Sequence, residues 1–142
     1  MDTMTYEKFK NQWLKHFAAP LNNKPRVKSL IRTEQYIWHL FSWGYLPKKC
    51  FLMGVAAAQA FDSLTPEEKE SAIYFERFGR YLPSLSDRKN ICAEDLTECT
   101  EIYVVARDFS WTYIWTHEGT LCGPYYCDRE LLSNYRSEGE SK

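Results

Sequence analysis

The sequence contains no stretch of about 18 consecutive apolar residues, the length expected of a membrane-spanning helix. The first ten residues, MDTMTYEKFK, lack the basic and then apolar pattern of a secretory signal. The six glycines are scattered and form neither a Walker-type nor a dinucleotide-binding pattern. We therefore expect a cytoplasmic protein that does not enter a membrane and that carries no glycine-rich nucleotide motif.

The five cysteines cannot all form intrachain disulfides, because their number is odd, and reduced thiols are expected in the cytosol. Three possible metal ligands, His117, Cys122 and Cys127, lie close together in the sequence. A structural zinc site normally contains Cys-x-x-Cys pairs, whereas the gaps between these residues are longer. Buried thiols and a packed histidine are the favoured interpretation. We expect neither a metal nor a cofactor.

The length of 142 residues and an apolar content of 44% predict a single folded domain, which we place at residues 1–132, followed by a flexible polar tail at 133–142. The net charge of −1 hides an asymmetry. Residues 1–49 contain nine basic and three acidic residues, whereas residues 50–142 contain nine basic and sixteen acidic ones. The two parts either neutralise each other within one fold or face partners of opposite charge.

Helical patterns fill the first part of the chain. A first helix carries an apolar side at three- and four-residue steps, formed by Tyr6, Phe9, Trp13 and Phe17. A second helix is predicted over residues 29–41, where Ser29 is a plausible N-cap. A third, alanine-rich helix is predicted over residues 49–61, with the side chains available for packing being Phe51, Val55, Ala58 and Phe61.

The remainder of the chain predicts short helices and strands. Thr65 begins a helix, because threonine is a good N-cap, Pro66 suits the first helical position and Glu68 completes a capping box. Residues 71–78 could continue this helix or form a strand, and their cluster of aromatic and β-branched residues favours a strand. A helical turn is expected at 93–96 and an edge segment at 124–126. Helices first and strands afterwards predict an α+β fold, in which N-terminal helices pack on a small antiparallel sheet.

Residues 101–118, EIYVVARDFSWTYIWTHE, predict a β-hairpin around a short polar break. Side chains of a strand alternate between its faces, so Trp111, Tyr113 and Trp115 share one face. Such a row can stack nucleic-acid bases, but that mode also needs a basic groove, and acidic residues flank this row. We expect no nucleic-acid binding. The rings are expected to pack under the helices, and the alternative is a protein-binding face.

His117 and Glu118, at the end of the hairpin, are the candidates for acid–base chemistry, because a carboxylate can orient an imidazole. Adjacent residues on a strand point to opposite faces, which makes direct pairing of the two side chains awkward. A structural role is therefore favoured.

Several short motifs resemble a bacterial family of domains of unknown function. They are WHLFS at 38–42, Gly54 with Ala60 and Phe61, IYVV at 102–105, DFSWTY at 108–113, THE at 116–118 and GPYY at 123–126. The stretch at 83–91 departs from the family pattern. The resemblance implies a small, cytosolic, single-domain protein, and it carries no catalytic assignment.

Small size, charge asymmetry and the lack of a catalytic motif favour a non-enzymatic protein-binding module, most concretely an immunity protein that neutralises a bacterial toxin by occluding it. The candidate partner-binding residues are Glu67, Glu68, Glu70, Glu94, Asp95 and Glu98, with Trp111, Tyr113 and Trp115 as aromatic anchors. The alternatives are a small enzyme or a small-ligand sensor that uses His117 and Glu118.

Overall fold

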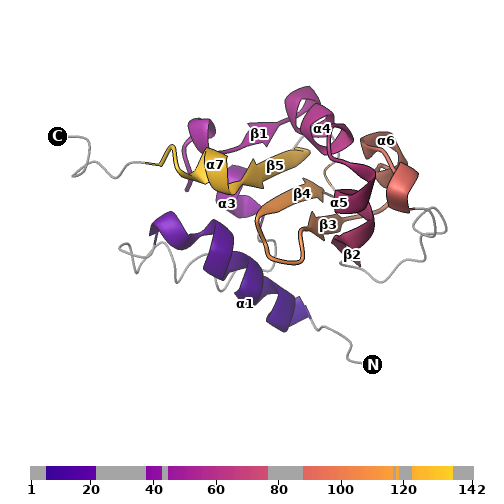
Figure 1. The fold of residues 1–142 in the computed structure, drawn as a ribbon. Coiled ribbons are helices and arrows are strands. Elements are labelled where there is room, and N and C mark those ends of the chain that lie inside the picture. The colour runs from indigo at the N-terminus through magenta and orange to yellow at the C-terminus, as the bar shows by residue number, and fades with distance from the viewer. Residues whose placement is uncertain are drawn as a thin grey trace. The chain divides into compact units, whose positions relative to one another are not determined.

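The computed structural model of the chain describes residues 6–21, 38–42, 45–76, 88–116, 118 and 123–135 (Figure 1). The chain divides into two compact units, Met1–Phe51 with Cys127–Lys142, and Leu52–Tyr126. The expectation of a single domain over residues 1–132 stays a prediction.

The first unit begins with helix α1, Tyr6–Phe17. Phe9, Trp13 and Phe17 have no exposed surface, which confirms the predicted apolar side of this helix. The ring of Trp13 packs against Phe17 at 5.0 Å and edge-on against Phe41 at 5.8 Å, between centroids. Phe41 belongs to the short helix α3, His39–Ser42. The rest of the predicted second helix, residues 29–37, lies outside the described residues.

The predicted third helix, over residues 49–61, is wrong in its first half. A 3-10 turn η2 (Lys48–Cys50) and a two-residue strand β1 (Leu52–Met53) precede helix α4, which spans Val55–Asp62. Gly54 has φ +66°, a left-handed conformation that side-chain-bearing residues rarely adopt, so the chain turns there from strand into helix. Val55 is 74% exposed, so only part of the predicted packing face is buried.

The described strands form a five-stranded sheet with the order β1-β5-β4-β3-β2 (Figure 1). The other four strands are β2 (Ile73–Glu76), β3 (Ile102–Val105), β4 (Trp111–Trp115) and β5 (Tyr125–Asp128). The pairs β1–β5, β2–β3 and β3–β4 are antiparallel. The predicted α+β fold is confirmed. However, the segment predicted at the sheet edge forms β5, which has neighbours on both sides.

The predicted hairpin is the pair β3–β4, in which Ile102 lies opposite Trp115 and Val105 opposite Thr112. Two backbone hydrogen bonds close its turn. The N–H of Ala106 donates to the carbonyl of Trp111 at 3.0 Å, and the N–H of Phe109 donates to the carbonyl of Ala106 at 2.8 Å. Phe109 has φ +58°, yet its side chain is buried. The buried ring stabilises a backbone conformation that is unfavourable for a bulky residue.

Three short helices complete the described part of the chain: α5 (Pro66–Ser71), α6 (Ala93–Leu96) and α7 (Arg129–Leu132). The capping box at Thr65 is confirmed. The Thr65 hydroxyl accepts from the Glu68 backbone N–H at 3.1 Å, and the Glu68 carboxylate accepts from the Thr65 N–H at 2.9 Å. The strand expected after this helix is β2, and the helical turn expected at residues 93–96 is α6.

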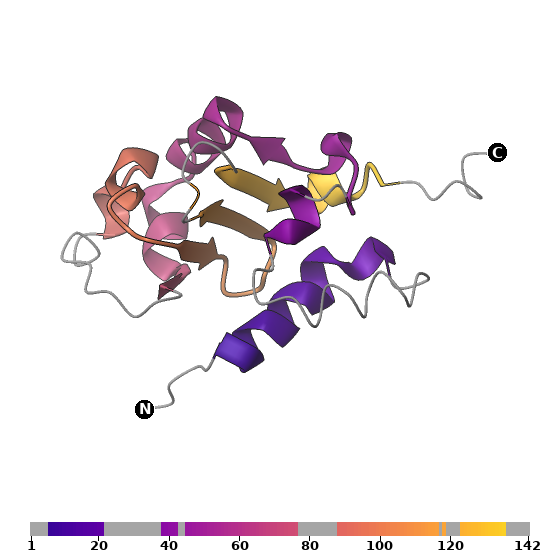
Figure 2. The same ribbon diagram turned by 180° about the vertical axis from the view of Figure 1, so that it is seen from behind.

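Phe61 of α4 joins the helices of the second unit to its sheet. Its ring lies 4.8 Å from that of Tyr113 and 6.4 Å from that of Trp111, and the Lys69 ammonium lies 5.4 Å from its centroid. Figure 2 shows α4 and α6 as neighbours beside the strands. Trp111 and Tyr113 are buried beneath α4, so the prediction that these two rings pack under a helix is confirmed.

Cys50, Cys92, Cys99 and Cys127 are free thiols in the structure, and Cys122 lies outside the described residues. The Cys127 thiol is fully buried and donates to the Cys50 carbonyl at 3.2 Å. Burial, followed by the neighbouring Asp128 carboxylate, raises the pKa of the Cys127 thiol. Because the thiolate is the reactive species, the native fold disfavours reaction at this cysteine.

Replacing Phe61 by alanine should lower the free energy of unfolding by about 3–5 kcal/mol, because the substitution leaves a cavity against Tyr113 and Trp111. Urea denaturation followed by tryptophan fluorescence measures this change. Gln59→Ala on the exposed side of the same helix is the matched control, with an expected change within about 0.5 kcal/mol. Equal effects of the two substitutions would contradict this packing.

Thr65→Ala should cost about 1 kcal/mol, because it removes the acceptor for the Glu68 N–H. Thr65→Ser keeps the hydroxyl and should retain nearly all of the stability. The same urea titration compares the two variants, and a loss of similar size in Thr65→Ser would show that the methyl group rather than the cap is responsible.

Candidate functional site

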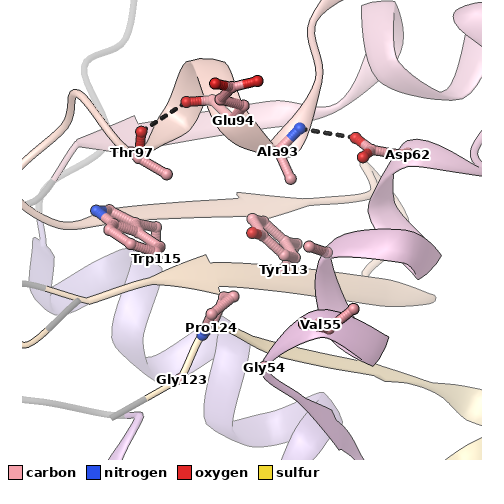
Figure 3. A pocket seen from close by; sticks show the side chains of 11 residues that line it. Gly54, Val55, Asp62, Ala93, Glu94, Thr97, Tyr113, Trp115, Gly123 and Pro124 are labelled. Carbon is pink, nitrogen blue, oxygen red and sulfur yellow. Dashed lines mark hydrogen bonds between the residues drawn. The ribbon is translucent and has the colours of Figure 1, made fainter. Parts of the chain in front are cut away.

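The second unit contains an open pocket of about 460 Å³ between α4, α6 and β4 (Figure 3). The described residues that line it are Gly54, Val55, Ala58, Asp62, Ala93, Glu94, Thr97, Tyr113, Trp115, Gly123 and Pro124. Most of them are apolar or small. Asp62 and Glu94 are the charged residues among them, and both are acidic.

Helix α4 contributes Val55, Ala58 and Asp62, which recur at three- and four-residue steps and therefore share one side of the helix. The small Ala58 leaves space on that side. The position of the helix is set at its start, where the Gly54 N–H donates to the Pro124 carbonyl at 2.9 Å. This hydrogen bond brings the wall formed by α4 next to the segment that enters β5.

Helix α6 forms the opposite wall. The Ala93 N–H donates to Oδ1 of Asp62 at 2.7 Å, so the carboxylate at the end of α4 satisfies an otherwise orphan donor at the start of α6 (Figure 3). At the other end of α6, the Thr97 hydroxyl donates to the Glu94 carbonyl at 2.7 Å. The two helices are thus connected directly along one side of the pocket.

Tyr113 and Trp115 of β4 provide the aromatic floor, and Figure 3 shows them next to each other on the strand. Tyr113 is 1% exposed, whereas Trp115 is half-buried. Burial, and second the charge of Asp62, raises the pKa of the Tyr113 hydroxyl. The hydroxyl therefore remains protonated at neutral pH and is not available as a base.

The sequence-predicted aromatic residues separate into two environments. Tyr113 and Trp115 line the pocket, but Trp111 does not, since its ring lies against Phe61 and stacks on Tyr126 at 6.5 Å. Trp111 instead borders a second, more polar hollow of about 420 Å³. Its lining contains residues of both charges, the cationic Arg107 and the acidic Glu68 and Asp108.

The six predicted acidic residues all lie on or directly after α5 and α6. Two have local structural roles. Glu68 closes the capping box of α5, and a carboxylate oxygen of Asp95 accepts from the Cys92 N–H at 3.0 Å. Glu70 lies 3.9 Å from the Lys89 ammonium, measured between charged atoms. The remaining three, Glu67, Glu94 and Glu98, are exposed.

The candidate acid–base pair is described only at Glu118, because His117 lies outside the described residues. Glu118 is exposed, and its backbone N–H donates to the Thr116 hydroxyl at 3.2 Å. Within the described ranges, no group of three or more His, Cys, Asp and Glu side chains is arranged to hold a metal ion. The same ranges contain no helix long and apolar enough to cross a membrane.

Sequence reasoning missed the walls of the pocket. Asp62, Ala93 and Thr97 belong to segments that look like ordinary helix ends in the sequence. The available signal was Gly54, because a glycine in the middle of a predicted helix is unfavourable and should have moved the start of that helix. A helix that starts at Val55 places Ala58 and Asp62 on one side.

Comparison with known proteins adds one assignment. Residues 3–126 match the family described as Domain of unknown function (DUF4275). Neither the curated proteins nor the solved structures contain a match. The matched segment covers the whole pocket and both aromatic residues of its floor. The chain therefore belongs to the DUF4275 family of domains of unknown function.

Proposed function

We propose that the chain is a non-enzymatic, cytoplasmic protein-binding module, and specifically an immunity protein that neutralises a bacterial toxin by direct binding and occlusion. The observation that carries the proposal is the combination of an open apolar pocket with exposed carboxylates on the neighbouring helices. A surface that combines apolar anchors with charges of one sign is typical of specific protein–protein recognition.

The negative charge of the second unit supports a partner with a basic surface. Residues 52–126 contain six lysines and arginines and twelve aspartates and glutamates, a net charge of −6. The side-chain carboxylates of Glu67, Glu94 and Glu98 make no hydrogen bond or ion pair with the described part of the chain. Within the described residues, no contact of these three carboxylates has to be broken before they can bind a cationic surface. Many toxin domains that act on nucleic acid or on anionic lipid carry such a surface, since their targets are anionic.

A small-ligand sensor is the second candidate function, and the size of the pocket is the observation that favours it. A volume of about 460 Å³ falls in the range of small-molecule sites, roughly 300–1,000 Å³. Native mass spectrometry of the purified protein tests this alternative. A ligand retained in stoichiometric amount would favour the sensor, and ligand-free protein would count against it.

Co-expression with a candidate toxin domain from a neighbouring gene should yield a stable one-to-one complex and protect cells from that toxin. Because the contact is electrostatic, raising the salt concentration about tenfold should weaken the measured affinity by about tenfold or more. Isothermal titration calorimetry at low and high salt measures this change. A toxin that does not bind, or a complex insensitive to salt, would contradict the proposal.

The triple variant Glu67→Gln, Glu94→Gln and Glu98→Gln should slow association with the toxin domain by about tenfold at low salt, because it removes three exposed negative charges from α5, from α6 and from the residues that follow α6. Stopped-flow fluorescence measures the association rate. The matched control, Glu7→Gln with Glu130→Gln, removes exposed carboxylates from α1 and α7. Because the first set removes three charges and the control removes two, the effects are compared per charge removed. An equal effect per charge would show that net charge alone matters, and would contradict a localised acidic surface.

A further inference from the structure

The pocket between α4, α6 and β4 has the chemistry of a site for an apolar group with a cationic end. Its floor is formed by the rings of Tyr113 and Trp115. Its walls include the small side chains of Ala58 and Ala93, which occupy little of the space between the helices. The charges at its border come from Asp62 and Glu94, and none of the described lining residues is basic. A neutral apolar group would use the floor alone, whereas an anionic group would meet two carboxylates.

Asp62 is placed to hold a cation. One of its oxygens accepts from the Ala93 N–H at 2.7 Å, which orients the carboxylate. The other oxygen makes no hydrogen bond with the described residues, and the side chain is exposed. Figure 3 shows Tyr113 between Asp62 and Trp115, so the partly exposed indole of Trp115 is available to the apolar part of a ligand rather than to its cationic end. Arginine suits such a carboxylate best, because its planar group can form two parallel hydrogen bonds with it.

Two exposed hydrophobic side chains lie at or beside the border of the pocket. Val55 is 74% exposed and Met53 is 47% exposed, and they are the exposed large hydrophobic residues of the described part of the chain. They flank Gly54, and Val55 lines the pocket itself. Apolar surface of this kind next to a pocket is typical of a protein-binding site, where a partner covers it.

We propose that this pocket is the anchor site for the toxin partner, and that it receives an apolar side chain of the toxin next to an arginine or lysine whose cationic group binds Asp62 and Glu94. This inference rests on the proposed function and adds the recognition element to it. The occupant is a segment of a basic protein rather than a free metabolite, because the net charge of −6 over residues 52–126 complements a cationic surface much larger than one ligand.

The chemistry of the pocket is tested first without the toxin, using two small probes of similar size and opposite charge, phenethylammonium and 3-phenylpropanoate. Phenethylammonium should shift the amide resonances of Gly54 and Ala93 and the indole resonance of Trp115 in ¹H–¹⁵N spectra, and 3-phenylpropanoate should not. Asp62→Asn with Glu94→Gln should weaken the phenethylammonium response about fivefold or more. The Asp62→Asn substitution keeps a side-chain oxygen that can accept from the Ala93 N–H, so it removes the charge while the link between the two helices is retained.

The occupant is tested with the toxin domain and a matched pair of substitutions on α4. Ala58→Phe fills the pocket, whereas Ala56→Phe adds the same ring to an exposed position that does not line it. Ala58→Phe should weaken toxin binding by at least about tenfold, and Ala56→Phe should leave it within about twofold. Val55→Lys, at an exposed position, supplies a second test if Ala58→Phe lowers the melting temperature. It introduces a cation beside the proposed cation site and should weaken binding to a similar extent.

The probe experiment and the toxin-binding experiment together distinguish failure of the anchor site from failure of the proposed function. Normal toxin binding by both Ala58→Phe and Val55→Lys would overturn the anchor site while leaving the proposed function intact. Equal responses to the two probes would overturn the cationic part of the inference. Selective binding of phenethylammonium by a protein that binds no toxin would overturn the proposed function, and would identify the pocket as a site for a free amine.

Discussion

The contact between Phe61 and the ring of Tyr113 is the interaction on which the second unit depends. The centroids are 4.8 Å apart and both side chains are almost fully buried. Tyr113 also forms part of the floor of the pocket, so one residue supports the core with one part of its surface and borders the site with another. A substitution that releases Phe61 would therefore disturb the pocket without touching its lining. For this reason, the effects of substitutions on binding have to be compared between variants of equal folding stability.

Two hydrogen bonds set the pocket walls around that contact. The Gly54 N–H reaches the Pro124 carbonyl at one end of α4, and the Asp62 carboxylate accepts from the Ala93 N–H at the other end. An eight-residue helix is too short to be stable in isolation, so its position depends on tertiary contacts of this kind. The left-handed φ of Gly54 allows the helix to begin directly after β1. The pocket is a consequence of this abrupt start, because a helix that begins at Val55 places the side with the small residue Ala58 over β4.

Local signals made much of this fold predictable. The alternating aromatic residues of β4 and the capping box at Thr65 each combine several residues within one short window, and both were confirmed. The start of α4 was not predicted, because the strand β1 exists only through pairing with β5, more than seventy residues later in the chain. The pocket was missed for the same reason. Its lining comes from four separate segments, and no local pattern shows that Asp62 lies beside Ala93. Tertiary contacts override local propensity at such positions.

The acidic residues illustrate why sequence alone ranks candidate contacts poorly. Glu68 and Asp95 look equivalent to Glu67 and Glu94 in the sequence, but the first two each accept a hydrogen bond from a backbone N–H at the start of a helix. Recruiting those two for a partner would cost about as much as the cap contributes. Glu94, in contrast, borders the apolar pocket with an exposed side chain. An ion pair formed at the edge of a covered apolar surface is less screened by solvent than one on an open helix face. In the proposed complex, charge at Glu94 and Asp62 should therefore contribute to partner choice more than charge at Glu67, although all three residues carry the same charge.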